Sequence, residues 1–286
     1  MCIRDRFRTG SNFLNLLRQA SFNGLIAFGM TCVILSDGID LSVGSTFALS
    51  AIICAELMIH GIPAAAAILI ALLAGTALGM VSGVLVTKGR LQPFIATLIT
   101  MTAYRGLALI ITDGKPVSRL AASVKSESGA FLFKVLGKGS FVFGPNDMIS
   151  IPIPAIILIL FLLVFYFVLH HTNFGRRIYA TGSNEKCAKL VGVNTTKIRI
   201  AVYSISGFMS ALAGLIMISR VDSAQPTLGE GYELDAIAAV VLGGTSMSGG
   251  RGKIVGTIAG VLIIAVLNNG LNILGVSTYY PVSYTH

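Results

Sequence analysis

Charge is scarce in this sequence. Asp, Glu, Lys and Arg make up 12% of its 286 residues, about half of the roughly 25% that is usual in soluble domains. Hydrophobic residues reach 54%, and the mean hydropathy is +0.83. A soluble domain of this length could not bury so much apolar surface in one core, because the buried fraction rises only slowly with chain length. The composition therefore predicts a protein whose apolar surface faces lipid.

Patterns for metal, nucleotide and catalytic sites are also missing. The four cysteines form no CxxC pair, and the adjacent His170 and His171 are too few to hold a metal ion. The glycine-rich stretch 243–253 fails the Walker phosphate-loop pattern, because Met247 stands at its first glycine and Ile254 at its hydroxyl position. We therefore expect no metal, no bound cofactor and no enzymatic activity in this chain.

What is present is a series of apolar runs, most of them near the ~20 residues that cross about 30 Å of hydrocarbon. Two are shorter, Phe22–Leu35 and Leu234–Gly243, and we expect them to be tilted, broken or re-entrant. The pattern predicts an all-α polytopic transmembrane bundle in a single domain, 1–286. The eight runs are Phe22–Leu35, Val43–Ile59, Ile62–Val86, Phe94–Thr112, Ile151–Leu169, Ile198–Ser219, Leu234–Gly243 and Ile254–Leu274.

The net charge of +9 is spread through loops between these runs. It forms no basic face with interleaved aromatic residues, so nucleic acid is not an expected partner. Excess Lys and Arg instead mark cytoplasmic loops, which places Lys88, Arg90, residues 170–199, Arg251 and Lys253 inside. Residues 113–150 would then lie outside, although they carry Lys115, Arg119, Lys125, Lys134 and Lys138.

Glycines recur every four residues in two of the runs. One run holds Gly75, Gly79 and Gly83, and the last run holds Gly256 and Gly260. Small residues at this spacing allow two helix backbones to approach closely in lipid. We therefore expect close helix contacts at both places.

Polar residues interrupt the apolar pattern between the first two runs. Asp40 can cap the helix that follows it. Alternatively, Asp37, Asp40 and Ser42 can line a solute path, since ionisable groups at membrane depth usually mark one.

Two further polar places lie inside apolar runs. Tyr104 and Arg105 stand in the fourth run, where the guanidinium either pairs with Asp37 or Asp40 or contacts the solute. Asn268 and Asn272 share a helix face in the last run, near Asn269. They either form hydrogen bonds between helices or line a pore.

The segment Thr181–Val193 predicts a two-turn helix between long spans. Asn184 is a good N-cap, Glu185 suits a helix N-terminus and Gly192 is a plausible C-terminal stop. Such a short helix is marginal alone. It is either a solvated connector or a docking helix that uses its apolar residues, Ala188, Leu190 and Val191.

Several motifs together resemble the ribose-type permease subunits of bacterial ATP-binding-cassette sugar importers. The resemblance extends from Asn12 to Tyr280 and is strongest near the C-terminal end. Its motifs lie at Gly38–Ser45, Phe94–Leu98 with Arg105-Gly106, Gly182–Glu185, Ser223–Thr227, Gly231–Thr245 and Asn268–Asn272.

This resemblance implies a homodimer in the bacterial inner membrane, an ATPase subunit that binds the ATP, and a periplasmic sugar-binding protein that delivers a monosaccharide such as ribose. It implies that the Gly182–Val193 helix, with Gly182, Asn184, Glu185, Ala188, Leu190 and Gly192, engages the ATPase. It also implies that Gln225, Glu230 and Glu233 face the binding protein.

The family usually has about ten spans, one more at each end. We therefore expect an internal fragment, family-like over 12–280, with non-native ends at 1–6 and 281–286. The alternatives are an ion-coupled carrier that uses Asp37 and Asp40, a permease for a nucleoside or another small polar solute, and a membrane enzyme.

Overall fold

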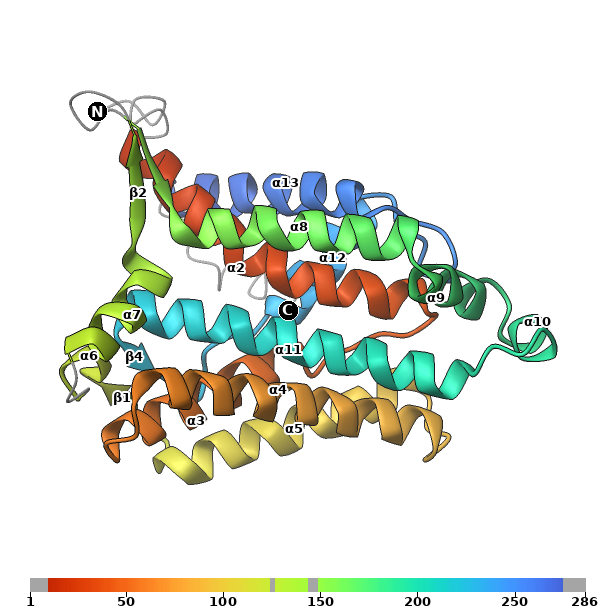
Figure 1. Ribbon diagram of the computed structural model, residues 1–286, viewed down its shortest axis with the longest axis horizontal. Helices are drawn as coiled ribbons and strands as arrows, with labels where there is room; N and C mark the ends of the chain where they lie inside the picture. Colours follow the sequence, from red (N-terminus) through yellow and green to blue (C-terminus); the bar gives the residue numbers. More distant parts are fainter. Residues whose placement is uncertain (1–9, 124–126, 144–148, 275–286) are drawn as a thin grey trace, which may run out of the picture.

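The computed structural model describes residues 10–123, 127–143 and 149–274, so the expected non-native ends lie outside it. Most helices run along one axis and form a bundle (Figure 1), which confirms the predicted all-α architecture. The helices are α2 (Gly10–Leu35), α3 (Val43–Ile59), α4 (Ala64–Thr87), α5 (Pro93–Thr112), α6 (Leu120–Ser123), α7 (Glu127–Lys138), α8 (Ile153–His171), α9 (Asn173–Ser183), α10 (Glu185–Leu190), α11 (Thr195–Val221), α12 (Tyr232–Leu242) and α13 (Ile254–Ile273). The short strands are β1 (Val117–Ser118), β2 (Ser140–Phe143), β3 (Ile149–Pro152) and β4 (Ser223–Ala224).

Five helices in the described part of the chain are long and apolar enough to cross a membrane: α4, α5, α8, α11 and α13. α12 has only 11 residues, as the short run there predicts. The expected break or re-entrant turn at Phe22–Leu35 is wrong, because α2 continues without a break from Gly10 and has 26 residues. Polar residues such as Asn12, Asn15 and Arg18 occupy its first half and conceal its length in the sequence.

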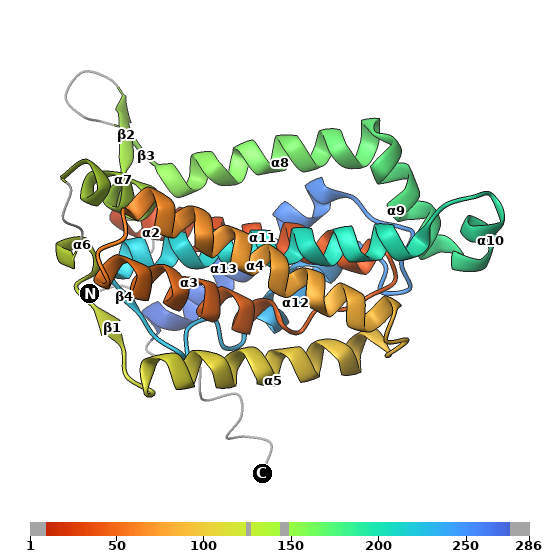
Figure 2. The ribbon, with the colours of Figure 1, turned by 60° about the horizontal axis from the view of Figure 1, so that its bottom comes forward.

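α11 lies at the centre of the bundle. In its most apolar window 67% of the residues are buried, against 28% in α4, α5 and α8. α5 and α8 lie on opposite flanks (Figure 2) and expose large apolar side chains, among them Ile99 and Ile110 on α5 and Leu163 and Phe167 on α8. Such faces suit contact with lipid or with another membrane chain.

The glycine repeats produce the expected close contacts. A methyl group on Gly79 would collide with the carbonyl oxygen of Tyr203, and one on Gly207 would collide with the carbonyl oxygen of Gly75. Gly260 is likewise pressed against the carbonyl oxygen of Ala239. α4 therefore packs backbone to backbone on α11, and α13 does so on α12.

One end of the bundle, here called the basic end, gathers loops that carry ten of the 21 Lys and Arg residues. The α4–α5 turn, α9, α10 and the 243–253 loop all lie there (Figure 1). The Gly250 N–H donates to the Leu35 carbonyl at 3.0 Å, and the Tyr179 hydroxyl donates to the Gly252 carbonyl at 3.0 Å. These bonds join the 243–253 loop to α9, both of which lie in segments that the sequence predicts to be cytoplasmic, and to the end of α2.

The opposite end, here called the capped end, is covered by parts of the 113–150 segment. Phe133 of α7 is fully buried, and its carbonyl accepts a hydrogen bond from the Ser219 hydroxyl of α11. Strand β1 pairs with β4, with Val117 opposite Ala224. The sequence suggests only a long charged loop here, whereas the structure forms a packed cap.

Candidate functional site

Asp40 lies at the centre of a buried group of hydroxyls. One carboxylate oxygen accepts from the Ser42 N–H at 3.0 Å and the Ser42 hydroxyl at 2.6 Å. The other accepts from the Ser206 hydroxyl of α11 at 2.8 Å. The residue is only 1% exposed. The predicted cap is wrong in detail, because Ser42 occupies the N-cap position of α3 and Asp40 instead closes a turn onto Ser42.

The same hydroxyls continue toward α5. The Ser42 and Ser82 hydroxyls are 3.4 Å apart, and Ser82 donates to Thr100 at 3.1 Å. Tyr104 is 5% exposed and donates to the Leu78 carbonyl of α4 at 2.8 Å. In this conformation Asp40, Ser42 and Tyr104 face protein, and their contacts join α3, α4, α5 and α11.

Arg105 pairs with neither Asp37 nor Asp40, the two partners considered from the sequence. Its guanidinium donates to the Leu228 carbonyl at 2.8 Å and also to the Pro226 carbonyl. A planar guanidinium can hold two acceptors at once. Arg105 therefore ties α5 to the irregular segment between β4 and α12.

That segment enters the bundle from the capped end. Gln225 and Glu230 are exposed, whereas Glu233 is partly buried in the first turn of α12 and lies against Gly44 at the start of α3. Its carboxylate accepts from the Gly231 N–H at 3.3 Å. The residues expected to face a binding protein are thus divided: Gln225 follows β4 at the capped end, and Glu233 is inside the bundle.

The asparagines of α13 lie in three different surroundings. Asn268 donates to the Asp235 carboxylate of α12 at 3.2 Å. Asn269 and Asn12 exchange reciprocal amide bonds of 2.9 and 3.0 Å. Asn272 is exposed. Interhelical bonding, one of the two interpretations from the sequence, accounts for Asn268.

The predicted two-turn helix is present but shorter. α10 begins after Asn184, whose side chain accepts from the Cys187 N–H at 3.0 Å, and this confirms the N-cap. At its other end Gly192 has φ +83°, and Val193 N–H bonds to the Ala188 carbonyl at 3.0 Å, a geometry typical of a helix stop. Gly182 belongs to α9 rather than to this helix and is pressed against the Leu35 carbonyl.

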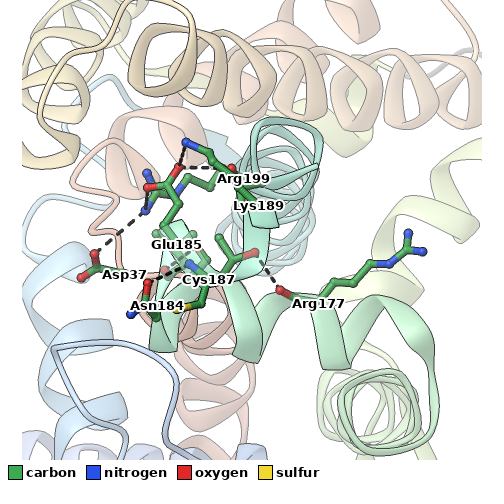
Figure 3. A network of polar contacts seen from close by, with 11 residues as sticks. Asp37, Arg177, Asn184, Glu185, Cys187, Lys189 and Arg199 are labelled. Carbon is green, nitrogen blue, oxygen red and sulfur yellow. Dashed lines mark hydrogen bonds and ion pairs between the residues drawn. The ribbon is translucent and has the colours of Figure 1, made fainter. Parts of the chain in front are cut away.

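A chain of ion pairs connects α10 with the α2–α3 loop (Figure 3). Glu185 contacts Lys189 at 2.8 Å and Arg199 at 3.2 Å, and Arg199 lies 3.9 Å from Asp37. The hydrogen bond from Lys189 is the main cause that lowers the pKa of Glu185. Burial raises the pKa of Asp37, Arg199 opposes this, and Glu185 adds to it.

Two cavities open beside this chain. One, of about 440 Å³, is lined by Arg90, Glu185, Lys189 and Arg199. The second, of about 320 Å³, includes Asp37 in its wall. From the sequence, Arg199 is predicted only to be one of the basic residues of a cytoplasmic loop. Its place at the start of a long apolar run, after a helix rich in charge, is the one signal that could have singled it out.

Comparison with known proteins identifies the family. Residues 12–285 match the family model described as "Branched-chain amino acid transport system / permease component". The ribose import permease protein RbsC of Bacillus subtilis (strain 168) is 54% identical over 269 residues, or 94% of this chain and 79% of the relative. No solved structure matches the chain significantly.

Two further relatives come from Escherichia coli (strain K12). The ribose import permease protein RbsC is 48% identical over 278 residues, covering 97% of this chain and 83% of the relative. The D-allose transport system permease protein AlsC is 38% identical over 277 residues, covering 96% and 80%. With its apolar helices, the chain therefore belongs to the family of multi-pass inner-membrane permease components of ATP-binding-cassette importers.

Proposed function

We propose that this permease conducts ribose into the cell. The observation that carries the proposal is the 54% identity, over 94% of the chain, to a protein named as a ribose import permease. The permease named for D-allose is less similar, at 38%. This comparison assigns no residue of the chain to sugar selection. The proposal therefore states which solute is carried and that it moves into the cell.

In this proposal, the ATPase subunit that drives transport binds at the basic end. We assign ATP binding to a separate ATPase subunit, because the only glycine-rich stretch of phosphate-loop type lacks the required residues. α10 projects beyond the bundle at this end (Figure 1). Leu190 is 87% exposed and Val191 is 79% exposed, while Ala188 packs inward. Two neighbouring exposed apolar side chains on a capped helix suit a partner surface.

The solute enters at the capped end in this proposal. Gln225 and Glu230 are exposed after β4 and are available to a periplasmic binding protein. The exposed apolar faces of α5 and α8 leave room for membrane lipid and for a second copy of the chain. Arg105 and Glu233 are the path-facing candidates we favour, because both adjoin the irregular segment that enters the bundle.

Reconstitution tests the function. The permease is placed in proteoliposomes with its ATPase and ribose-binding protein, and uptake of labelled ribose and labelled allose is compared. We expect ATP-dependent ribose uptake that needs all three components. Uptake by the permease alone under an ion gradient would show a secondary carrier instead. ATP-dependent uptake of another solute in preference to ribose would show that the solute is misassigned.

A further inference from the structure

The smaller cavity at the basic end adjoins the chain of ion pairs through Asp37. It measures about 320 Å³ and lies between three segments: the α2–α3 loop, the start of α5 and the 243–253 loop. Its volume is at the lower limit of the roughly 300–1,000 Å³ typical of small-molecule sites. Its wall includes Asp37, Ile39, Gln92, Phe94 and Met247.

The side chains around this cavity have complementary chemistry. Asp37 supplies carboxylate oxygens that accept from hydroxyls, and Gln92 supplies an amide that can both donate and accept. Phe94 is 48% exposed and Met247 is 43% exposed, so both leave apolar surface uncovered. A small ligand with several hydroxyls and an apolar C–H face matches this set. A purely apolar ligand would form no hydrogen bond with the carboxylate or the amide.

The backbone at Asp37 is held in place before any ligand arrives. Asp37 has φ +61° and lies next to Gly249, where a methyl group would come within 3.0 Å of the Asp37 Cβ. The Arg199 guanidinium lies 3.9 Å from the carboxylate. On the other wall, the Thr97 hydroxyl of α5 donates to the Ile39 carbonyl at 3.2 Å. The two walls are therefore joined at a fixed spacing.

We propose that this cavity is an exit subsite, where a monosaccharide is held by Asp37 and Gln92 and packs on Phe94 before it leaves the permease. The inference rests on the proposed import function, which makes the basic end the side where the solute is released. The Arg199 side chain contacts both Asp37 and Glu185 of α10. Movement of α10 by the ATPase therefore changes the electrostatic surroundings of the subsite carboxylate.

Inhibition from the product side tests the subsite. Proteoliposomes are made with the complete importer oriented so that the ATPase faces the lumen, and the lumen is preloaded with increasing unlabelled ribose. Initial uptake of labelled ribose is then measured. We expect wild-type uptake to fall as lumenal ribose occupies the subsite. In Asp37→Asn and Phe94→Ala we expect the half-inhibitory ribose concentration to rise about tenfold or more, since the first change replaces a charged acceptor by a weaker neutral one and the second removes the ring that packs on the sugar.

Matched controls separate this effect from misfolding. Asp113→Asn changes an exposed aspartate that also has positive φ, at the far end of α5. Phe13→Ala truncates an exposed phenylalanine near the start of α2. Both controls should keep the wild-type inhibition curve, and the thermal unfolding midpoint of every variant is compared with that of the wild type.

The outcomes distinguish the two proposals. Ribose uptake with an inhibition curve that Asp37→Asn and Phe94→Ala leave unchanged would overturn the subsite and leave the import function standing. Equal shifts in the controls would also overturn it. Absence of ATP-dependent ribose uptake by the wild-type importer would overturn the import function itself, and the subsite for this sugar with it.

Discussion

Arg199 of α11 is shared by two carboxylates, lying 3.2 Å from Glu185 and 3.9 Å from Asp37. One carboxylate belongs to the exposed helix α10 and the other to the loop that leads into α3. A single guanidinium contacts both carboxylates (Figure 3), so we expect a displacement of α10 to change the surroundings of Asp37. This arrangement gives the proposed docking helix an electrostatic connection to the exposed loop between α2 and α3.

The N-cap of α10 offers a first test of that connection. Asn184→Ala removes the acceptor for the Cys187 N–H, a change that costs about 1 kcal/mol of helix stability. We expect the stimulation of ATP hydrolysis by the loaded binding protein to fall several-fold. Asn194→Ala is the matched control, because Asn194 caps α11 with the same 3.0 Å bond to the Lys197 N–H. An equal loss in both variants would argue against a coupling role for α10.

The Glu185 contacts also predict a pH dependence. Hydrogen bonding to Lys189 lowers the pKa of Glu185. A carboxyl group with a lowered pKa in the folded state stabilises that state above its ordinary pKa of about 4.3. The stabilisation is lost as the pH falls through the lowered value. We therefore expect α10 to stay ordered between pH 7 and about 5 and to loosen only in stronger acid.

A spin label on Cys187 measures this effect. Cys187 is exposed while Cys32 and Cys54 are buried, and Cys2 is replaced by serine. Label mobility should rise only in acid for the wild-type helix. In Glu185→Gln it should be higher at neutral pH and should no longer change in acid. A rise in mobility near pH 6 in both proteins would contradict the assignment.

Asp40 is expected to stabilise the fold. Asp40→Ala would leave the donors of Ser42 and Ser206 without their acceptor, and we expect a loss of about 3 kcal/mol, since an unpaired buried donor carries its full desolvation cost. Asp40→Asn keeps one accepting oxygen and should lose about 1 kcal/mol. Unfolding of the purified permease in detergent gives both values. Equal losses would mean that the side-chain volume, and not hydrogen bonding, is important.

The backbone contact between α4 and α11 leads to a further prediction. Gly79→Ala would place a methyl group against the Tyr203 carbonyl, and we expect a loss of about 2 kcal/mol from overpacking. Gly106→Ala is the control, because nothing lies within 4 Å of a methyl group there. Alanine at this helical position should be neutral or should stabilise by about 0.5–1 kcal/mol. The same unfolding measurement compares the two variants.

The sequence predicts the apolar helices well, because continuous apolar stretches and glycine spacing are local signals. The boundaries of α3 are as expected, and α5 begins one residue earlier than expected, at Pro93. The length of α2 is not predictable in this way. A helix surrounded by other helices can place polar residues such as Asn12 against partners, here Asn269, and so needs no continuous apolar run.

The contacts of polar residues are predicted less well. The sequence offers two carboxylates as partners for Arg105, whereas the structure supplies the carbonyls of Pro226 and Leu228. Every residue type has a backbone carbonyl, so a partner of this kind cannot be predicted from the sequence. The cap at the 113–150 segment is missed for a related reason, because Phe133 is buried by tertiary packing in a charged segment.

The backbone contact between α4 and α11 has a mechanical consequence. Side chains at an ordinary helix interface can change rotamer and let one helix slide past the other. Around Gly75, Gly79 and Gly207 there is almost no side-chain layer to rearrange. α4 and α11 should therefore move as one rigid unit within the membrane. We expect the conformational change that opens each side in turn to occur where this pair contacts the surrounding helices.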